Sequence, residues 1–537
     1  MLVNFISSIV KVQSDIMEQI GASCISLNNI RNDEENETKT EKLIASSKSL
    51  SSHEENISLK GLFPQIIASL IAAAFHIGNG MAMSYSSVVI SQLEKPDSDI
   101  KPTTGEKALI ASILILVAPL ASVFCGVIMD KIGRINTIKT AMVPAVVGWC
   151  LTALAKNTTV LITGRALVGI ASAFGTSPAI VYIAEISNPK MRMSFLQLCP
   201  TYVALGMIFI YLGGWFMHWR LLAWVSNVFA ILPCLAVFFI PESPMWLIMK
   251  GRVKEAKNSL NWLHKYQPPI PGKDETFADI QFKLLKKEQE ENSEKSKNKG
   301  TVMDIAKEFL KPTGYKPLII LLPLFFCQHF SGVYITMFYS ITFIEEAGTN
   351  VSGYFASIMI GVIRLVMASC NIFVLKYMNR RTTIMWSCLG MAVCMFTSGL
   401  FTLWIKEGQT TAKWVPVAAL LLYVVFSVVG LMFLPFMVIP ELFPQEIRGT
   451  GYTIGYSLST AFMFASLESY YFLNETLGGA TNLQWFFAIV CLAGLVYTYM
   501  FLPETKGKKL IDITTNFQKG WLYIGKSHKE DNVNNNV

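Results

Sequence analysis

The sequence predicts an all-α membrane protein, in which twelve transmembrane helices form two pseudo-symmetric six-helix bundles joined by a small helical cytoplasmic segment. Three observations support this prediction. Only 15% of the 537 residues are charged and 52% are hydrophobic, whereas about a quarter of the residues of a soluble domain are charged. Apolar runs of about 20 residues, the length of a membrane-spanning helix, recur between residues 62 and 502. Charged motifs at the ends of these runs also repeat at an offset of about half the chain.

The apolar runs predict helices, because they are too long for membrane-spanning strands and lack the alternation that such strands need. In order, the twelve predicted spans are 62–83, 108–128, 138–155, 159–183, 195–216, 220–240, 317–340, 353–375, 382–404, 414–439, 450–472 and 483–502. Basic residues gather in the loops on one side, which the positive-inside rule places in the cytoplasm. This group comprises Lys131, Arg134, Lys139, Lys190, Arg192, Lys376, Arg380, Arg381 and Arg448. The net charge of +8 therefore reflects the topology of the chain and does not indicate a nucleic-acid surface. An even number of spans places both termini in the cytoplasm. We expect the protein to lie in the plasma membrane.

The chain divides into two apolar halves, a charged linker and two polar tails. Residues 1–58 are predicted as a disordered cytoplasmic tail, 59–248 and 313–507 as the two bundles, and 508–537 as a second cytoplasmic tail. In the linker, 249–312, the sequence from Val253 to Leu263 places Val253, Ala256, Leu260 and Leu263 on one helical face. We therefore expect a small helical bundle that braces the two halves, with a solvated linker as the alternative.

The cysteine pattern implies no cofactor or metal. The ten cysteines are scattered singly and show no C-x-x-C spacing, so neither a disulfide framework nor a zinc site is indicated. No nucleophile and base constellation is present either, and we do not expect an enzyme. A monomer is sufficient for the expected architecture.

Two charged motifs recur in the second half of the chain. Glu185 and Arg192 frame the sequence EISNPKMR, and Glu441 and Arg448 frame ELFPQEIR 256 residues later. PES at 241–243 is followed 262 residues later by PET at 503–505. Such carboxylates and arginines at span ends can form an ionic network between the halves when the cytoplasmic mouth is closed, with static topology signals as the alternative reading. The expected network comprises Asp130, Arg134, Arg165, Glu185, Arg192 and Glu242 in the first half and Arg380, Arg381, Glu441, Arg448 and Glu504 in the second.

The loop from Gly126 to Arg134, of sequence GVIMDKIGR, resembles the signature loop of the major facilitator superfamily. Its counterpart in the second half departs from that pattern, with Lys376 for the aspartate and Asn379 for the glycine. Further motifs resemble the sugar porter family, in particular its insect trehalose and glucose carriers. These motifs are GRALVG at 164–169, YIAE at 182–185, PESPMWL at 241–247, QHFSG at 328–332, ELFP at 441–444 and PETKG at 503–507.

The resemblance implies a substrate site for a neutral polyol, which needs hydrogen-bonding side chains and an aromatic wall. Gln197 and Gln328 match sugar-contacting glutamines of the family, whereas His329 and Tyr334 replace a glutamine and an asparagine. Phe436 and Ser459 stand where the family has tryptophan and asparagine. The full expected set is Gln197, Gln328, His329, Ser331, Tyr334, Tyr339, Phe436 and Ser459, and helix packing is the alternative role for each.

The resemblance also bears on proton coupling. Proton-coupled relatives carry a span-1 aspartate that pairs with the arginine found here as Arg165, but the aspartate position aligns with Ser86. We therefore expect a sugar facilitator, for a hexose or trehalose, that works by alternating access as a uniporter. His329, Glu468 and Arg364 keep open a proton-coupled or other organic-solute carrier, since all three can carry charge within or near the membrane. A non-transporting sugar sensor is a further alternative.

Overall fold

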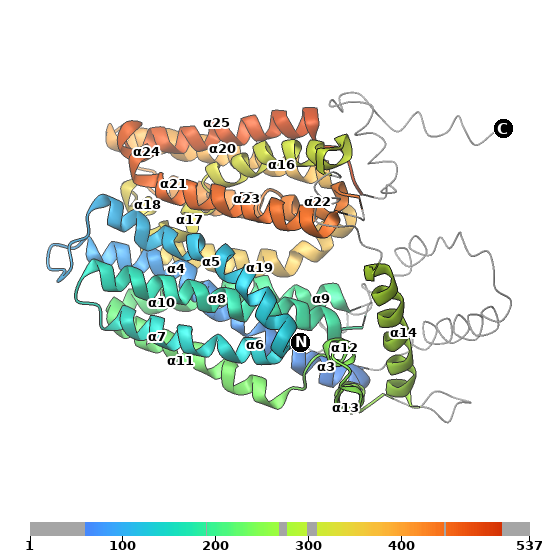
Figure 1. The fold of residues 1–537 in the computed structure, drawn as a ribbon. Coiled ribbons are helices and arrows are strands. Elements are labelled where there is room, and N and C mark those ends of the chain that lie inside the picture. The colour runs from blue at the N-terminus through green and yellow to red at the C-terminus, as the bar shows by residue number, and fades with distance from the viewer. Residues whose placement is uncertain (1–58, 189–190, 268–275, 298–308, 445–446, 507–537) are drawn as a thin grey trace, which may run out of the picture.

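The computed structural model describes residues 59–188, 191–267, 276–297, 309–444 and 447–506. The predicted tails at 1–58 and 508–537 and the basic residue Lys190 lie outside these residues. Every regular element in the described ranges is a helix, which confirms the all-α class. Figure 1 shows the first half, in blue to green, lying beside the second half, in yellow to red, with α12, α13 and α14 beyond one end.

The first half contains interrupted as well as continuous helices. Its elements are α3 (Leu59–Ala73), α4 (Phe75–Leu93), α5 (Thr104–Ile132), α6 (Arg134–Thr140), α7 (Met142–Ala153), α8 (Thr158–Ile186), α9 (Arg192–Leu196), α10 (Leu198–Phe216) and α11 (Trp219–Ala236). Local sequence sets the starts of two long helices. Thr103 and Glu106 form a reciprocal capping box before α5, and the Asn157 side chain accepts a hydrogen bond from the N–H of Val160 at the start of α8.

The end of the first half and the linker together form a small helical cluster, which we call the linker cluster. It contains a 3₁₀ turn, η1 (Val237–Phe239), and the helices α12 (Pro244–Met249), α13 (Val253–Leu263) and α14 (Phe277–Lys297). The predicted helix at 253–263 is confirmed, and Ala256, Leu260 and Leu263 are buried, although Val253 at its first turn is exposed. The cluster is anchored to the first half, where Gln65 Nε2 of α3 lies 3.4 Å from His264 Nδ1.

The second half follows the same plan. Its elements are α16 (Pro312–Phe330), α17 (Ile335–Phe338), α18 (Ser340–Glu346), α19 (Gly353–Tyr377), α20 (Arg380–Lys406), α21 (Val415–Val429), α22 (Leu434–Leu442), α23 (Arg448–Glu468), α24 (Tyr470–Thr476) and α25 (Ala480–Phe501). The seventh span is broken between α16 and α17, where Gly332 has a φ of +93°. A Cβ on Gly332 would lie 2.8 Å from the ring of Phe487, so both the backbone and the packing require glycine there.

The twelve predicted spans fall into two groups in the structure: ten lie on long apolar helical stretches, and two do not. Ten helical stretches in the described ranges are long and apolar enough to cross a membrane. The predicted span 138–155 is divided at Ala141 into α6 and α7, which are each short. The predicted span 450–472 falls on α23 and α24, and α23 is rich in Gly, Ser and Thr. Both nevertheless run alongside their neighbours in the bundles (Figure 1).

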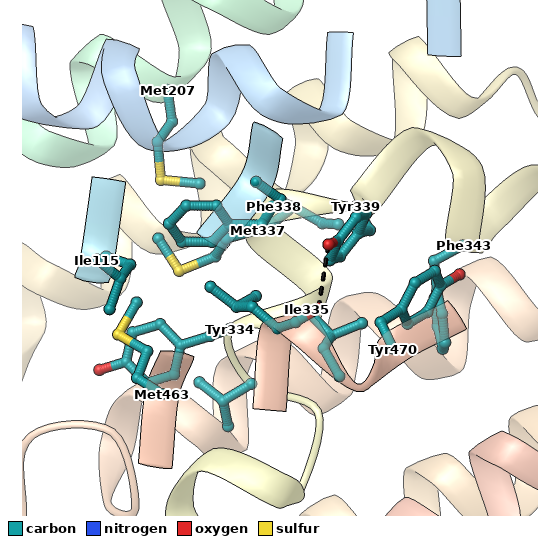
Figure 2. Packing of buried hydrophobic residues seen from close by; sticks show 14 of the residues in the cluster. Ile115, Met207, Tyr334, Ile335, Met337, Phe338, Tyr339, Phe343, Met463 and Tyr470 are labelled. Carbon is teal, nitrogen blue, oxygen red and sulfur yellow. Dashed lines mark hydrogen bonds between the residues drawn. The ribbon is translucent and has the colours of Figure 1, made fainter. Parts of the chain in front are cut away.

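Close helix packing builds the core where the halves meet. A Cβ on Gly80 of α4 would lie 2.0 Å from the carbonyl oxygen of Val203 in α10, so these helices approach as closely as small residues allow. Between the halves, α10 packs against α19, α5 against α23, and α4 against α17 and α18. Figure 2 shows the resulting core, in which Ile115 and Met207 of the first half surround Tyr334, Met337 and neighbouring residues of the second.

Candidate functional site

The first charge cluster lies where α5 meets α6. The guanidinium of Arg134 binds the Glu185 carboxylate through two nitrogens, with Nη2 2.7 Å from Oε1 and Nε 3.0 Å from Oε2. Both residues are largely buried, so this bidentate pair is shielded from solvent. Asp130 lies 3.8 Å from Arg134 and its side chain is 71% exposed, so its contribution is small.

Glu242 caps the start of α6 from a distant part of the chain. Its carboxylate accepts hydrogen bonds from the backbone N–H groups of Arg134, at 3.0 Å, and Ile135, at 3.0 and 3.1 Å. Gly133 allows this approach, because it has a φ of +101° and a Cβ there would lie 2.4 Å from Glu242 Oε2. The hydroxyl of Ser243 donates to Glu185, so the cap and the ion pair form one cluster.

The second half repeats this arrangement with the corresponding residues. Glu504 accepts from the backbone N–H groups of Arg380, at 3.0 Å, and Arg381, at 3.1 Å, at the start of α20. The Arg380 guanidinium lies 3.6 Å from Glu441, and the Thr505 hydroxyl donates to Glu441. Asn379, which replaces the glycine of the first half, adopts an ordinary extended conformation. The repeated motifs therefore encode a repeated structure.

The described bonds of these two clusters join residues of the same half. Arg192 is exposed, and Arg448 is partly buried at the first residue of α23. The expectation that the network also links the halves to each other stays a prediction. We call the end of the bundles that carries both clusters the charged end, and the opposite end the far end.

A cavity of about 170 Å³ lies between the halves. Five helical spans line it, three of them from the second half. The lining residues are Asn79, Met83, Pro200, Val203, Ala204, Met207, Tyr334, Met337, Arg364, Ala368, Val428, Met432 and Phe433. Its wall is thus mostly apolar, with few polar groups, as small-molecule sites usually are.

Of the residues expected to bind substrate, Tyr334 lines this cavity directly. His329 lies behind it, with its ring stacked on Tyr334 at 5.0 Å between centroids and its Nε2 2.8 Å from the Ser459 hydroxyl. The Gln328 amide donates to the carbonyl oxygen of Met432, at 2.8 Å, and Met432 is part of the wall. These side chains therefore hold the wall from behind.

The other expected residues also lie outside the described lining. The Gln197 amide donates to the carbonyl oxygen of Ala368 in the opposite half, at 2.6 Å. The Ser331 hydroxyl donates to the carbonyl oxygen of Gln328, at 2.9 Å. Tyr339 donates to the carbonyl oxygen of Leu467, at 3.1 Å, and stacks on Tyr470, while Phe436 packs against Phe325.

The motif-based reading missed most of the wall. Met83, Met207, Met337 and Met432 line the cavity, but a methionine at helical spacing gives the same sequence signal in a core as in a binding site. Arg364 gave a clearer signal, since a charge within a membrane span is costly and suggests function. Only the structure shows that Arg364 lies in the wall of the cavity.

Arg165 ties together three helices of the first half. It donates to the carbonyl oxygens of Ala82, at 2.7 Å, and Ile110, at 3.3 Å, and to the hydroxyl of Ser86. It is fully buried, and these acceptors come from α4 and α5. Ser86 therefore occupies the place opposite this arginine, as the alignment predicts.

Hydrogen bonds join the two halves toward the far end. Ser87 Oγ lies 2.9 Å from Ser340 Oγ and accepts from the N–H of Ile341 at 2.9 Å. The Ser112 hydroxyl donates to Glu468 at 2.6 Å, and the Tyr211 hydroxyl donates to the carbonyl oxygen of Met337 at 2.8 Å. In this conformation the far end is therefore held together by polar contacts.

Comparison with known proteins gives one consistent answer. The family model described as "Sugar (and other) transporter" matches residues 62–517. The facilitated trehalose transporter Tret1 of Drosophila yakuba is 27% identical over 455 residues, which are 84% of this chain and 52% of that protein. The chain thus spans about half the length of this relative, but 88% of the Tret1 of Apis mellifera ligustica, at 26% identity and again over 84% of this chain.

Two solved structures share the fold. The xylose transporter XylE from E. coli, in an inward open conformation, has a TM-score of 0.65 at 17% identity, covering 84% of this chain and 98% of that one. A D-xylose-proton symporter has a TM-score of 0.60 at 17% identity, covering 84% and 100%. At this identity the likeness concerns the fold alone.

Proposed function

The chain belongs to the sugar and other transporter family of integral membrane transporters, and from this premise we propose that it is a facilitator that carries a hexose or trehalose across the plasma membrane by alternating access. The observation that carries the proposal is the cavity between the halves, which is lined by residues of both. A site in that position is exposed to either side when the halves rock against each other. The names of the Tret1 relatives support a sugar as substrate.

The paired charge clusters support the rocking motion. Each one holds two helix ends of its own half together, through Arg134 and Glu185 or Arg380 and Glu441. We propose that the halves therefore move as units, and that Arg192, Arg381 and Arg448 complete a network between them when the charged end closes. The charged end then faces the cytoplasm, with both termini on that side, because the basic residues gather there.

We propose uniport as the transport mode. The hydroxyl of Ser86 receives the hydrogen bond from Arg165 that a carboxylate receives in proton-coupled relatives. A serine hydroxyl does not ionise near neutral pH, so this position supplies no coupling group. Proton coupling remains the second candidate because His329 is buried in the membrane domain, directly behind Tyr334.

The site is proposed to use two layers of side chains. Tyr334 contacts the sugar, and the residues behind the wall fix its shape and polarity. This second layer comprises Gln197, Gln328, His329, Ser331, Tyr339, Phe436 and Ser459. Its members bond to backbone groups or stack on aromatic rings, which holds the first layer in one geometry.

The test is uptake of radiolabelled glucose and trehalose into liposomes that contain the purified full-length chain, with and without a pH gradient. We expect saturable uptake that stops when the sugar concentrations inside and outside are equal. The pH gradient is expected to have no effect on this uptake. Replacement of Tyr334 by alanine is expected to reduce uptake at low substrate about tenfold, equivalent to about 1.4 kcal/mol of lost binding. Arg252→Gln, at an exposed ion pair of the linker cluster, is the matched control and is expected to transport normally.

Two results would change the proposal. Uptake no faster than into empty liposomes, for both sugars, would contradict glucose and trehalose as the substrates. Accumulation of sugar against its gradient when a proton gradient is applied would replace uniport with proton coupling.

A further inference from the structure

Arg364 is a buried cation in the wall of the central cavity. It lies within α19 (Gly353–Tyr377), its exposed fraction is 5%, and it borders the cavity together with Tyr334 and Met432. Moving a guanidinium from water into a protein interior costs several kcal/mol unless it is paired. Such a group is retained in a membrane span when it has a partner or a task.

The described partners of Arg364 are weak. Its Nη1 lies 3.1 Å from the thioether sulfur of Met432, and its Nη2 lies 3.5 Å from the carbonyl oxygen of Val333. The buried Nε has no hydrogen-bond partner. A guanidinium offers five N–H donors, and the ion pairs found among the described residues do not include Arg364.

Arg165 provides an internal comparison. It is buried as deeply in the other half, but it donates to two carbonyl oxygens and one hydroxyl, at positions enclosed by α4 and α5. Arg165 is therefore satisfied by fixed oxygen acceptors of its own half. Arg364 lacks such a set of oxygen acceptors and borders the cavity. A ligand in the cavity is therefore placed to supply the acceptor that the described protein groups do not.

The rest of the wall offers few polar partners to a substrate. Four methionines, with Val203, Ala204, Val428 and Phe433, supply apolar surface. The polar side chains beside Arg364 in the described lining are those of Asn79 and Tyr334. A sugar that buries many hydroxyls against this wall would leave several of them without partners, which costs free energy for each. A negative charge opposite Arg364 compensates for that loss, since charge-assisted bonds are about twice as strong as neutral ones.

From this geometry we propose that the transported molecule is a small hydroxylated anion, a sugar acid or a sugar phosphate, whose negative group pairs with Arg364 while its ring lies against Tyr334. The proposal rests on the proposed transport function and names its substrate class. The cavity volume of about 170 Å³ is below the roughly 300–1,000 Å³ of pockets for drug-sized ligands. In this conformation it therefore suits one sugar ring.

The experiment compares neutral and anionic monosaccharides in liposomes that contain the full-length chain. Glucose is measured beside gluconate and glucuronate, which carry a carboxylate, and glucose 6-phosphate, which carries a phosphate. At least one anion is expected to show a KM about tenfold or more below that of glucose. Net anion uptake moves charge, so an inside-positive membrane potential is expected to accelerate it and to leave glucose uptake unchanged.

Variants of Arg364 separate a binding role from a structural one. Arg364→Gln is expected to raise the KM for the preferred anion about tenfold or more and to leave the KM for glucose unchanged. Arg364→Lys retains the charge and is expected to restore part of the anion preference. Arg252→Gln removes an exposed arginine and is expected to behave like the unchanged protein.

Each outcome decides one question. Anion preference that is lost in Arg364→Gln and partly restored in Arg364→Lys supports the proposal, and the preferred anion tells whether carboxylate or phosphate is recognised. Saturable glucose uptake without uptake of any anion overturns the proposal and leaves the sugar-transport function standing. An anion preference that is the same in Arg364→Gln also overturns it. No saturable uptake of either class contradicts the proposed function itself.

Discussion

His264 shows how one residue makes the stability of a surface cluster depend on pH. It ends α13, packs against the ring of Phe277 in α14 and faces Gln65 of α3. Burial lowers the pKa of His264 from 6.5 to about 4. Between these values the unfolded chain binds a proton that the folded chain excludes, so stability falls as the pH falls. Acidification from pH 7 to pH 5 is expected to cost on the order of 2 kcal/mol in the linker cluster.

The measurement for His264 is limited proteolysis of the linker cluster at pH 7 and pH 5 in detergent. The unchanged protein is expected to be cleaved faster at pH 5, and His264→Gln is expected to lose that difference. His218→Gln, at an exposed histidine, serves as the control and is expected to keep it. A pH effect of equal size in His264→Gln and the unchanged protein would contradict this account.

At the same scale, the sequence motifs pointed to the residues of the two charge clusters but to few residues of the cavity wall. Glu242 and Glu504 repeat within short, ordered motifs, and their shared chemistry as helix caps follows from their place at span ends. Gln328 and His329 also match a family pattern, but in the last turn of α16 they bond to Met432 and Ser459 and lie behind the wall. The face of a helix that meets a cavity depends on how the helix packs, which the motif alone does not give.

At the scale of the helix, the two glutamate caps make a quantitative prediction. Glu242 and Glu504 each accept from the first N–H groups of a helix, α6 or α20, where a negative charge is stabilised by the helix dipole. Glu242→Gln and Glu504→Gln retain the shape and remove the charge. Each is expected to destabilise its half by about 1 kcal/mol and therefore to lower the thermal unfolding midpoint in detergent.

The control for the caps is Glu255→Gln, which alters an exposed carboxylate in α13 and is expected to leave the midpoint unchanged. A shift in one cap variant without the other would show that the two halves are not equivalent at this point. Midpoints equal to that of the unchanged protein in both would refute the capping role.

The extent of the helices was predictable, because the length of each apolar run in the sequence indicates the length of the helix. The interruptions of the helices were not predictable. The predicted span 138–155 is divided at Ala141, and the seventh span divides into α16, α17 and α18. Such breaks are stabilised by contacts with other helices, as with the Tyr423 hydroxyl that donates to the carbonyl oxygen of Ser331 at 2.8 Å. The sequence of a single span does not reveal those contacts.

At the scale of the whole molecule, the far-end contacts are expected to control which side of the cavity opens. Ser87 contributes two of them, to the hydroxyl of Ser340 and the N–H of Ile341. Ser87→Ala removes both and leaves the buried N–H of Ile341 without this acceptor, which favours separation of the halves at this end. Hydrogen exchange of the backbone N–H groups in α17 and α18 is expected to become about tenfold faster.

Thr163→Ala is the control for Ser87, because it also removes a hydroxyl from a first-half helix but at an exposed position bonded within α8. Its exchange in α17 and α18 is expected to match the unchanged protein. Equal exchange in Ser87→Ala and Thr163→Ala would mean that the Ser87 contacts do not hold the far end closed.

The repeat in the sequence predicted two halves, because a duplicated motif requires a duplicated environment. It did not predict how the halves meet. The pairs Ser112 with Glu468 and Gln197 with Ala368 join residues that are far apart in the chain and belong to no shared motif. Contacts of this kind follow from the docking of two complete units, so only the assembled fold defines them.

The methionine-lined wall has a consequence for oxidative chemistry. The thioether of Met432 already lies 3.1 Å from Arg364, and oxidation would convert it from an apolar sulfur to a sulfoxide, whose oxygen is a strong acceptor. The guanidinium would then have an oxygen partner supplied by its own chain. Oxidation of Met432 by peroxide would thereby make the Arg364 guanidinium unavailable to an anion without modifying Arg364 itself. A methionine sulfoxide reductase would reverse the change.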